Sequence, residues 1–407
     1  MNKKAKILIY ACIIVLTSLV SFNFGLRSSN NSLSNNTTTN EKKESKTLNF
    51  DRVNKNISSL VDLIDKRYLH DFKYEDIEEG IYKGILESLN DKYSEFFNEK
   101  EYKELMDHNS GEFSGVGIQV GVSDDGYIEV IAPIKGSPAD ISGIKAGDKI
   151  SKINGNVFLG KDLDKAVKVM RGKVGETVVI TVKRNIDGKE QDVDIKVTRA
   201  VINLDSVYPK MLENNIGYIL VTNFQEKTDE DFEKAVKELK DKGATKLILD
   251  LRNNPGGLLD STLNIANMLM NKGVLITARD KNGNVEKYET QDGTLTDIPM
   301  VTLINKGSAS ASEVMSGALQ DRKRSILVGE NSYGKGVIQQ IFPFNVETKQ
   351  EGLKITIAEF FTPNGHKIHE KGIKPDYEVK IPENVKKIGV DNLENDTQLQ
   401  KAIELLK

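Results

Sequence analysis

Cysteine, histidine and excess positive charge are all scarce in this chain of 407 residues. The single cysteine, Cys12, excludes an internal disulfide, a thiolate metal cage and a CxxC redox pair. The four histidines include no HExxH pattern, so we expect no metal site. A formal net charge of -3 provides no basic excess for binding phosphate backbones, and nucleic acid is therefore not an expected partner.

The first 26 residues differ in composition from the rest of the chain. Lys3, Lys4 and Lys6 precede a mostly apolar run from Ile7 to Leu26 that contains no acidic residue. Twenty helical residues span about 30 Å, enough to cross a bilayer with the lysines on the cytoplasmic side. We expect residues 1–26 to be a single-pass signal anchor in the cell membrane, with the rest of the chain extracytoplasmic, or secreted if the segment is cleaved.

Composition changes several times after this segment. Residues 27–48 are mostly Ser, Asn, Thr, Lys and Glu, which predicts a flexible linker. Residues 49–107 carry apolar side chains at helical spacing and predict amphipathic helices, which either pack on the next domain or form an arm for a homodimer. Glycine-punctuated β-branched runs predict a small β domain at 108–200. Alternating strands and helices predict an α/β core at 201–382, followed by a helical tail at 383–407.

A junction of small residues, Asn305-Lys-Gly-Ser-Ala-Ser-Ala-Ser312, separates a strand predicted at 300–304 from a helix predicted at 312–321. Ser310 would then lie at a strand-to-helix elbow. Small neighbours would admit a substrate backbone there, and the unpaired N–H groups of the helix N-terminus would stabilise developing negative charge. These features fit a serine nucleophile, whereas a serine that only caps the helix is the alternative.

Lys335 lies between two glycines in Tyr333-Gly-Lys-Gly-Val-Ile-Gln-Gln340. It follows a strand predicted at 325–328, and it could reach back to the elbow. Partial desolvation there would lower its pKa and let it act as a general base. Gln339 follows four residues later, on the same face if the segment is a strand, where its amide could hold the amine. A surface lysine and a structural amide are the alternatives.

A third motif, Leu247-Ile-Leu-Asp-Leu-Arg-Asn-Asn-Pro-Gly-Gly257, is typical of a buried strand that ends in a Pro-Gly-Gly turn. The backbone N–H of Gly256 or Gly257 could join that of Ala311 as an oxyanion hole. A tight turn without a ligand is equally compatible with this pattern.

Taken together, the three motifs resemble those of the C-terminal processing peptidases, also called tail-specific proteases, which are serine peptidases. They occur in the family's order, and the resemblance extends from about residue 50 to the end. It implies a multidomain α+β chain with a ClpP/crotonase-like α/β peptidase core. It also implies a nucleophile at Ser310, a general base at Lys335 and an orienting amide at Gln339. Gly256, Gly257 and Ala311 would supply the oxyanion hole, and no cofactor is required.

The predicted β domain resembles the PDZ domains of secreted proteases, in the motifs Gly115-Val-Gly-Ile118 and Gly136-Ser-Pro-Ala139 through Ala146-Gly-Asp148. The residues expected to bind the C-terminus of a protein substrate are Gly115, Val116, Gly117 and Ile118. Their backbone N–H groups would hold the carboxylate, and the strand at Ile118 would accept the peptide by β-addition. The implied function is an endopeptidase that cleaves proteins near their C-termini, with recruitment and gating by the PDZ domain.

Two other functions stay open at the level of sequence. The chain could be a binding scaffold on an inactive peptidase-like fold, although intact Ser310 and Lys335 argue against this. A Ser-His hydrolase would need a histidine within hydrogen-bond reach of Ser310. The candidates are His70, His108, His366 and His369. Arg171 is either a bridge between the PDZ and peptidase domains or an ordinary surface residue.

Overall fold

The computed structural model describes residues 48–186, 188–346, 349–385 and 387–407, in two compact units that divide after Phe72. The expected anchor at 1–26 lies outside the described residues, as does nearly all of the expected linker. None of the described helices is long and apolar enough to cross a membrane. The described part of the first unit contains helix α2 (Phe50–Arg67), which begins at a capping Asn49 side chain.

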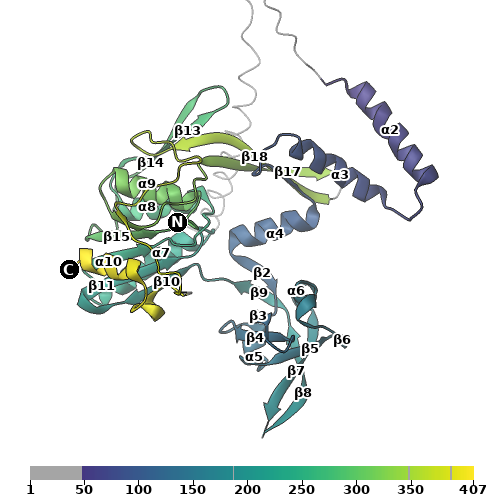
Figure 1. The fold of residues 1–407 in the computed structure, drawn as a ribbon, viewed down its shortest axis with the longest axis horizontal. Helices are drawn as coiled ribbons and strands as arrows, with labels where there is room; N and C mark the ends of the chain where they lie inside the picture. Colours follow the sequence, from purple (N-terminus) through teal and green to yellow (C-terminus); the bar gives the residue numbers. More distant parts are fainter. Residues whose placement is uncertain (1–47, 187, 347–348, 386) are drawn as a thin grey trace, which may run out of the picture. The chain divides into compact units, whose positions relative to one another are not determined.

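A six-stranded sheet forms the centre of the C-terminal part of the second unit (Figure 1). Its strands, in spatial order, are β10 (Val207–Met211), β11 (Ile216–Val221), β12 (Lys246–Asp250), β15 (Met300–Ile304), β16 (Ile326–Gly329) and β19 (Tyr377–Glu378). Pairing is parallel from β11 to β19 and antiparallel between β10 and β11. The α/β core predicted from the alternation of elements is confirmed.

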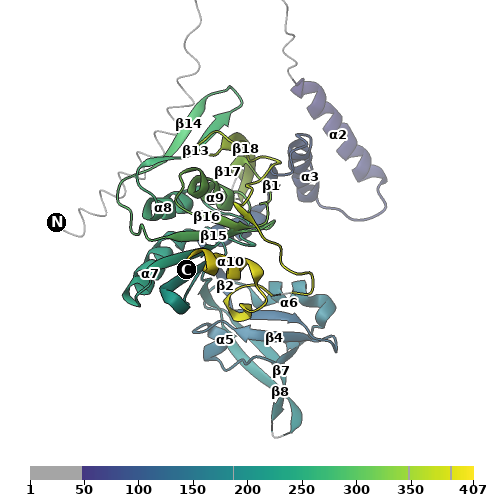
Figure 2. The ribbon, with the colours of Figure 1, turned by 60° about the vertical axis from the view of Figure 1, so that its left-hand side comes forward.

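Helices cover both faces of this sheet (Figure 2). One face packs against α7 (Thr228–Asp241), α8 (Leu259–Leu269) and α9 (Ala311–Asp321), and the other against α10 (Thr397–Leu405). Successive strand residues point to opposite faces, so Ile219 joins the core under α7–α9 while Tyr218 joins the core under α10. The C-terminal helix therefore closes one side of the core.

A five-stranded antiparallel sheet contacts α8 and α9 as well. Its main path is β1 (Glu95–Phe97), β18 (Lys349–Phe361), β13 (Gly273–Asp280) and β14 (Val285–Thr290), and β17 (Val337–Val346) also pairs with β18. Strand β1 lies between helices α3 (Tyr74–Glu87) and α4 (Glu99–Ser110), in the region predicted to be entirely helical. That expectation was incomplete, because three residues are too few to show a period.

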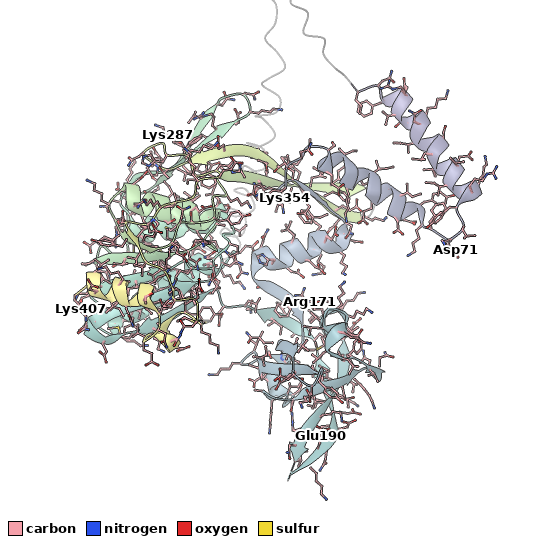
Figure 3. The ribbon with its side chains drawn as sticks, in the orientation of Figure 1. Asp71, Arg171, Glu190, Lys287, Lys354 and Lys407 are labelled. Atoms are coloured by element: carbon pink, nitrogen blue, oxygen red, sulfur yellow. The ribbon has the colours of Figure 1, made fainter. Side chains whose placement is uncertain are left out.

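The small β domain predicted from the glycine-punctuated runs is present. Its sheet has the order β3 (Ile118–Val122), β4 (Ile128–Pro133), β5 (Lys149–Ile153), β7 (Thr177–Ile186) and β8 (Lys189–Thr198), with β6 (Asn156–Val157) paired to β5. It also carries the short helices α5 (Pro138–Ile141) and α6 (Leu163–Met170). In Figure 3, Glu190 marks the end of the long β7–β8 hairpin. Strand β3 forms one edge of the sheet, so its outer side can accept a further strand.

We predict that Leu399→Ala destabilises the peptidase core by about 2–5 kcal/mol, because Leu399 of α10 is fully buried in the same core cluster as Ile248 and Val301. Urea denaturation followed by circular dichroism would measure the loss. Glu404→Ala, at an exposed position of the same helix, is the control and should change stability by less than about 0.5 kcal/mol. Equal effects of the two substitutions would show that α10 does not stabilise the core.

Candidate active site

Ser310 lies at the junction of β15 and α9, as predicted, and has a strained backbone. Its φ of 52° and ψ of -113° fall outside the regions that ordinary L-residues favour, and such strain persists only where the surroundings hold it. Ser310 is the N-cap residue of α9, and its N–H donates to the Glu313 side chain three residues into the helix at 2.9 Å. The capping position that the sequence offered as an alternative is thus occupied by a residue whose backbone is strained.

Hydrogen bonds join the elbow to the Pro-Gly-Gly turn that follows β12. The Ser308 hydroxyl donates to the carbonyl oxygen of Leu251 at 2.7 Å. The Asn254 carbonyl oxygen accepts from the Ala309 N–H at 3.0 Å and from the Ser312 hydroxyl at 2.9 Å. Two of the three motifs recognised in the sequence are thus joined by hydrogen bonds.

The two glycines of the turn differ in what their N–H groups do. The Gly256 N–H donates to the side-chain oxygen of Asn254 at 2.8 Å. The N–H groups of Gly257 and Ala311 make no hydrogen bond within the described part of the chain. Gly256 is nonetheless required to be glycine, because at its φ of 106° a Cβ would come within 2.8 Å of the Ala309 oxygen. Gly257 and Ala311 are therefore the pair with free donors.

Glu313 connects the elbow to the segment that carries Lys335. We predicted no role for this residue from the sequence. Its side chain is fully buried, and one carboxylate oxygen accepts from the N–H groups of Ser310 at 2.9 Å and Lys335 at 2.8 Å. The other oxygen accepts from the Ser332 hydroxyl and the Gly334 N–H, both at 2.6 Å. Burial raises the pKa of Glu313, and these four donors act in the opposite direction.

Lys335 is partly buried, and burial lowers its pKa, as does the neighbouring charge of Lys354. Its Nζ lies 4.9 Å from the ring centroid of Tyr93 and makes no hydrogen bond to Ser310 in the described residues. The Gln339 amide donates to the Val337 carbonyl oxygen at 3.2 Å and to the Thr356 hydroxyl at 3.4 Å, not to Lys335. The strand register shifts between Ile338 and Gln339, so the simple face-sharing argument for Gln339 does not apply.

A cavity of about 260 Å³ brings the expected residues together. Ser310, Ala311, Gly257, Lys335 and Gln339 all line it. Its other walls are largely apolar and include Leu259, Ile276, Val314, Ile338 and Phe360. None of the four histidines, all of which are described, lines this cavity. The residues that carry a hydroxyl, two free N–H donors and a partly desolvated amine thus line one cavity.

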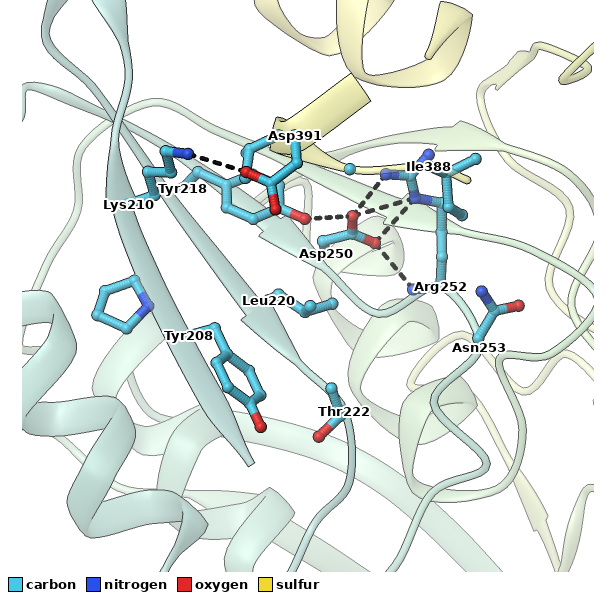
Figure 4. A pocket seen from close by; sticks show the side chains of 13 residues that line it. Tyr208, Lys210, Tyr218, Leu220, Thr222, Asp250, Arg252, Asn253, Ile388 and Asp391 are labelled. Atoms are coloured by element: carbon cyan, nitrogen blue, oxygen red, sulfur yellow. Dashed lines mark hydrogen bonds and ion pairs between the residues drawn. The ribbon is translucent and has the colours of Figure 1, made fainter. Parts of the chain in front are cut away.

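A second cavity, of about 480 Å³, lies on the α10 face of the central sheet (Figure 4). At its edge the Asp250 carboxylate accepts from the Tyr218 hydroxyl at 2.7 Å and from the Arg252 guanidinium at 2.6 Å. Arg252 also contacts Asp396 just before α10, at 2.8 Å. The buried Arg252 therefore links the end of β12 to the C-terminal segment through ion pairs. This larger cavity is not lined by Ser310, Lys335 or Gln339, so the smaller one is the candidate active site.

Comparison with known proteins decides the family. Residues 215–379 match the model of peptidase family S41, and residues 129–184 match a PDZ domain model. Residues 15–101 match the model of the activating protease CtpB N-terminal domain. The carboxy-terminal processing protease CtpA of Bacillus subtilis is 35% identical over 338 residues, which are 83% of this chain and 70% of the relative. The chain belongs to the carboxy-terminal processing proteases of family S41.

Further relatives agree with membership of this S41 group. The carboxyl-terminal-processing protease of Picosynechococcus is 39% identical over 327 residues, covering 79% of this chain and 77% of the relative. A crystallised candidate S41 protease from Bacteroides fragilis has 18% identity and a TM-score of 0.53, over 80% of this chain and 89% of that one, which shows similarity of fold alone. The chain is accordingly a serine peptidase with a PDZ domain.

In the PDZ domain of this S41 protease, the loop that the sequence predicts to bind peptides lies between β2 (Glu112–Gly115) and β3. The carbonyl oxygens of Val116 and Gly117 accept from the N–H groups of Ala139 and Ile134, both at 2.9 Å. Their own N–H groups make no hydrogen bond within the described residues. Arg171 lies 5.3 Å from the ring centroid of Phe113, and no hydrogen bond or ion pair joins it to residues 201–382 in the described part of the chain.

We predict that Glu313→Gln lowers both activity and stability. Replacing either carboxylate oxygen by an NH2 group points donors at two existing donors, which costs about 1–3 kcal/mol. Peptidase assays and urea denaturation would measure the two losses. Glu383→Gln, at an exposed position, removes the same charge and should change neither. Full activity of Glu313→Gln would show that the elbow and the Lys335 segment hold their geometry without this carboxylate.

Proposed function

We propose that this protein cleaves protein substrates near their C-termini as a serine endopeptidase with a Ser310–Lys335 dyad. The observation that carries the proposal is the cavity in which Ser310, the free N–H groups of Gly257 and Ala311, and the partly desolvated Lys335 converge. Family membership supports the reaction class, and the geometry supports the assignment of roles.

In the proposed reaction, the neutral Lys335 amine takes the hydroxyl proton while Ser310 Oγ attacks the scissile carbonyl carbon. The carbonyl oxygen becomes an oxyanion, which the N–H groups of Gly257 and Ala311 stabilise. The Lys335 ammonium then gives its proton to the leaving amine, and an acyl-enzyme remains on Ser310. Water, deprotonated by the same lysine, hydrolyses the acyl-enzyme.

The observed position of Lys335 corresponds to a resting geometry in this proposal. Its Nζ lies over Tyr93 rather than in a hydrogen bond with Ser310, so a side-chain rotation must precede attack. The Gln339 side-chain oxygen makes no hydrogen bond within the described residues, which leaves it free to accept from the rotated lysine. Gln339 would then orient the amine, as the family resemblance implies.

The PDZ domain would recruit substrates and gate the peptidase. The free N–H groups at Val116 and Gly117 suit a terminal carboxylate, and the edge strand β3 suits an extended peptide. We further propose that residues 1–26 anchor the chain in the cell membrane with its catalytic domains extracytoplasmic, on the basis of their composition. A homodimer through the N-terminal helices is proposed on analogy within the family alone.

We predict that Ser310→Ala and Lys335→Ala each lower the cleavage of fluorescent casein by at least about a thousandfold, because each removes a group that takes part in bond breaking. Purified full-length protein in mild detergent would be assayed. The controls are the single alanine variants of His70, His108, His366 and His369, which should remain active. Casein cleavage that survives Ser310→Ala, or is lost on replacing one histidine, would contradict the dyad.

The pH dependence provides a separate prediction. Only the neutral amine can accept a proton, so kcat/KM should rise with pH through the pKa of Lys335. Burial and Lys354 lower that pKa, so the midpoint should lie below the value of about 10.4 for a free lysine. Lys335→Arg should be inactive throughout, because arginine stays charged. A midpoint at or above the free-lysine value would contradict a desolvated base.

A further inference from the structure

The segment Asp91–Ser94, which lies outside the matched peptidase region 215–379, contacts the proposed general base. The ring centroid of Tyr93 is 4.9 Å from Lys335 Nζ. A cation within about 6 Å of an aromatic face is attracted by the ring quadrupole. The neutral amine lacks this attraction, so the contact acts on one protonation state of Lys335 and not on the other.

Tyr93 is held firmly enough to position its neighbour. The Asp91 carboxylate accepts from the Tyr93 N–H at 3.1 Å and from the Ser94 hydroxyl at 2.6 Å. The Ser94 oxygen in turn accepts from the Thr356 N–H of β18 at 3.0 Å, and β1 continues from this turn as a partner strand of β18. The His369 ring packs edge-on against Tyr93, with centroids 6.4 Å apart. The turn is thus built into the sheet beside Lys335.

Other charges act on Lys335 from the elements packed around it. Lys354, labelled on β18 in Figure 3, disfavours the ammonium form, as does burial. The carboxylates of Glu313 on α9 and Asp91 in the turn favour it. Lys92 lies over the same tyrosine, with its Nζ 4.9 Å from the ring centroid. Tyr93 therefore contacts the ammonium groups of both Lys92 and Lys335, an interaction that an apolar side chain without a ring could not provide.

We infer that Tyr93 is a positioning residue for Lys335, whose ring face holds the resting ammonium and releases the lysine toward Ser310 once the amine is neutral. The inference rests on the dyad proposed above. It makes the N-terminal helical region part of the active site, since the peptidase core alone does not supply this ring. It also explains how Lys335 and Ser310 can line one cavity without a hydrogen bond between them, because the charged amine interacts with the Tyr93 ring instead.

The direct test measures the pKa of Lys335 without catalysis. Full-length Ser310→Ala protein is labelled with trace acetic anhydride over a range of pH, and mass spectrometry follows acetylation of the Lys335 peptide. Tyr93→Leu keeps an apolar cover but removes the ring, so the pKa should fall by roughly 0.5–1.5 units. Tyr93→Phe keeps the ring and should leave it nearly unchanged. The inference would be overturned if the Lys335 pKa were the same with Tyr, Leu or Phe at position 93. It would also be overturned if Tyr93→Leu and Tyr93→Phe shifted that pKa equally.

The activity of the serine-containing proteins gives a second readout. The acid limb of kcat/KM against pH should move to lower pH in Tyr93→Leu by the same amount as the labelled pKa, and stay in place in Tyr93→Phe. A purely structural role would lower kcat/KM without moving the limb, which would overturn the inference. If Tyr93→Leu fails to fold, Tyr93→Met replaces it. Casein cleavage that survives Ser310→Ala would contradict the dyad, whereas the labelling result tests the Tyr93 contact separately.

Discussion

The geometry of the candidate site depends on one buried carboxylate. Glu313 accepts hydrogen bonds from the backbone at Ser310, Gly334 and Lys335, so a single side chain fixes the serine elbow and the lysine segment to each other. Removing a carboxylate from water is costly, and burial indeed raises the pKa of Glu313. Four hydrogen-bond donors that converge on the carboxylate offset this cost. This arrangement also maintains the strained backbone of Ser310, which has no local reason to leave the regions that L-residues prefer.

A second buried charge system supports the other side of the site. Arg252 lies between the carboxylates of Asp250 and Asp396, and the Gln398 side-chain oxygen also accepts from it. The strand end that this cluster fixes continues directly into Asn254 and the Pro-Gly-Gly turn, which carry the free N–H of Gly257. Breaking such a buried pair leaves an uncompensated charge and costs more than the pair contributes. The C-terminal segment is therefore structurally coupled to the oxyanion side of the site, although it is distant from Ser310 in sequence.

Much of this could be predicted from the sequence, and the exceptions have physical reasons. The strand at 300–304 and the helix that follows it were recognisable because buried apolar runs and small-residue junctions are local patterns. The sequence could not show whether Gly256 or Gly257 has the free N–H donor. That choice depends on whether the Asn254 side chain accepts a hydrogen bond from its own loop. Glu313 received no role from the sequence, since nothing local shows that four donors from two segments meet there. The bulge at Gln339 and the three-residue strand β1 also depend on pairing with a distant strand, β18.

The position of α4 suggests how the PDZ domain and the active site can be mechanically connected. Leu105 and Asn109 of this helix line the catalytic cavity, and the helix leads through Gly111 into β2, the entry to the β domain. The Asn109 carbonyl oxygen accepts from the Glu226 N–H of the peptidase core at 3.0 Å. The Gly111 carbonyl oxygen accepts at 2.9 Å from the N–H of Leu204, where the chain returns from the β domain. Both chain connections of the β domain therefore meet at the C-terminal end of one helix that forms part of the cavity wall. A peptide that shifted the β domain would have to act through this helix end, and so on the space in front of Ser310, which gives the proposed gating a physical route.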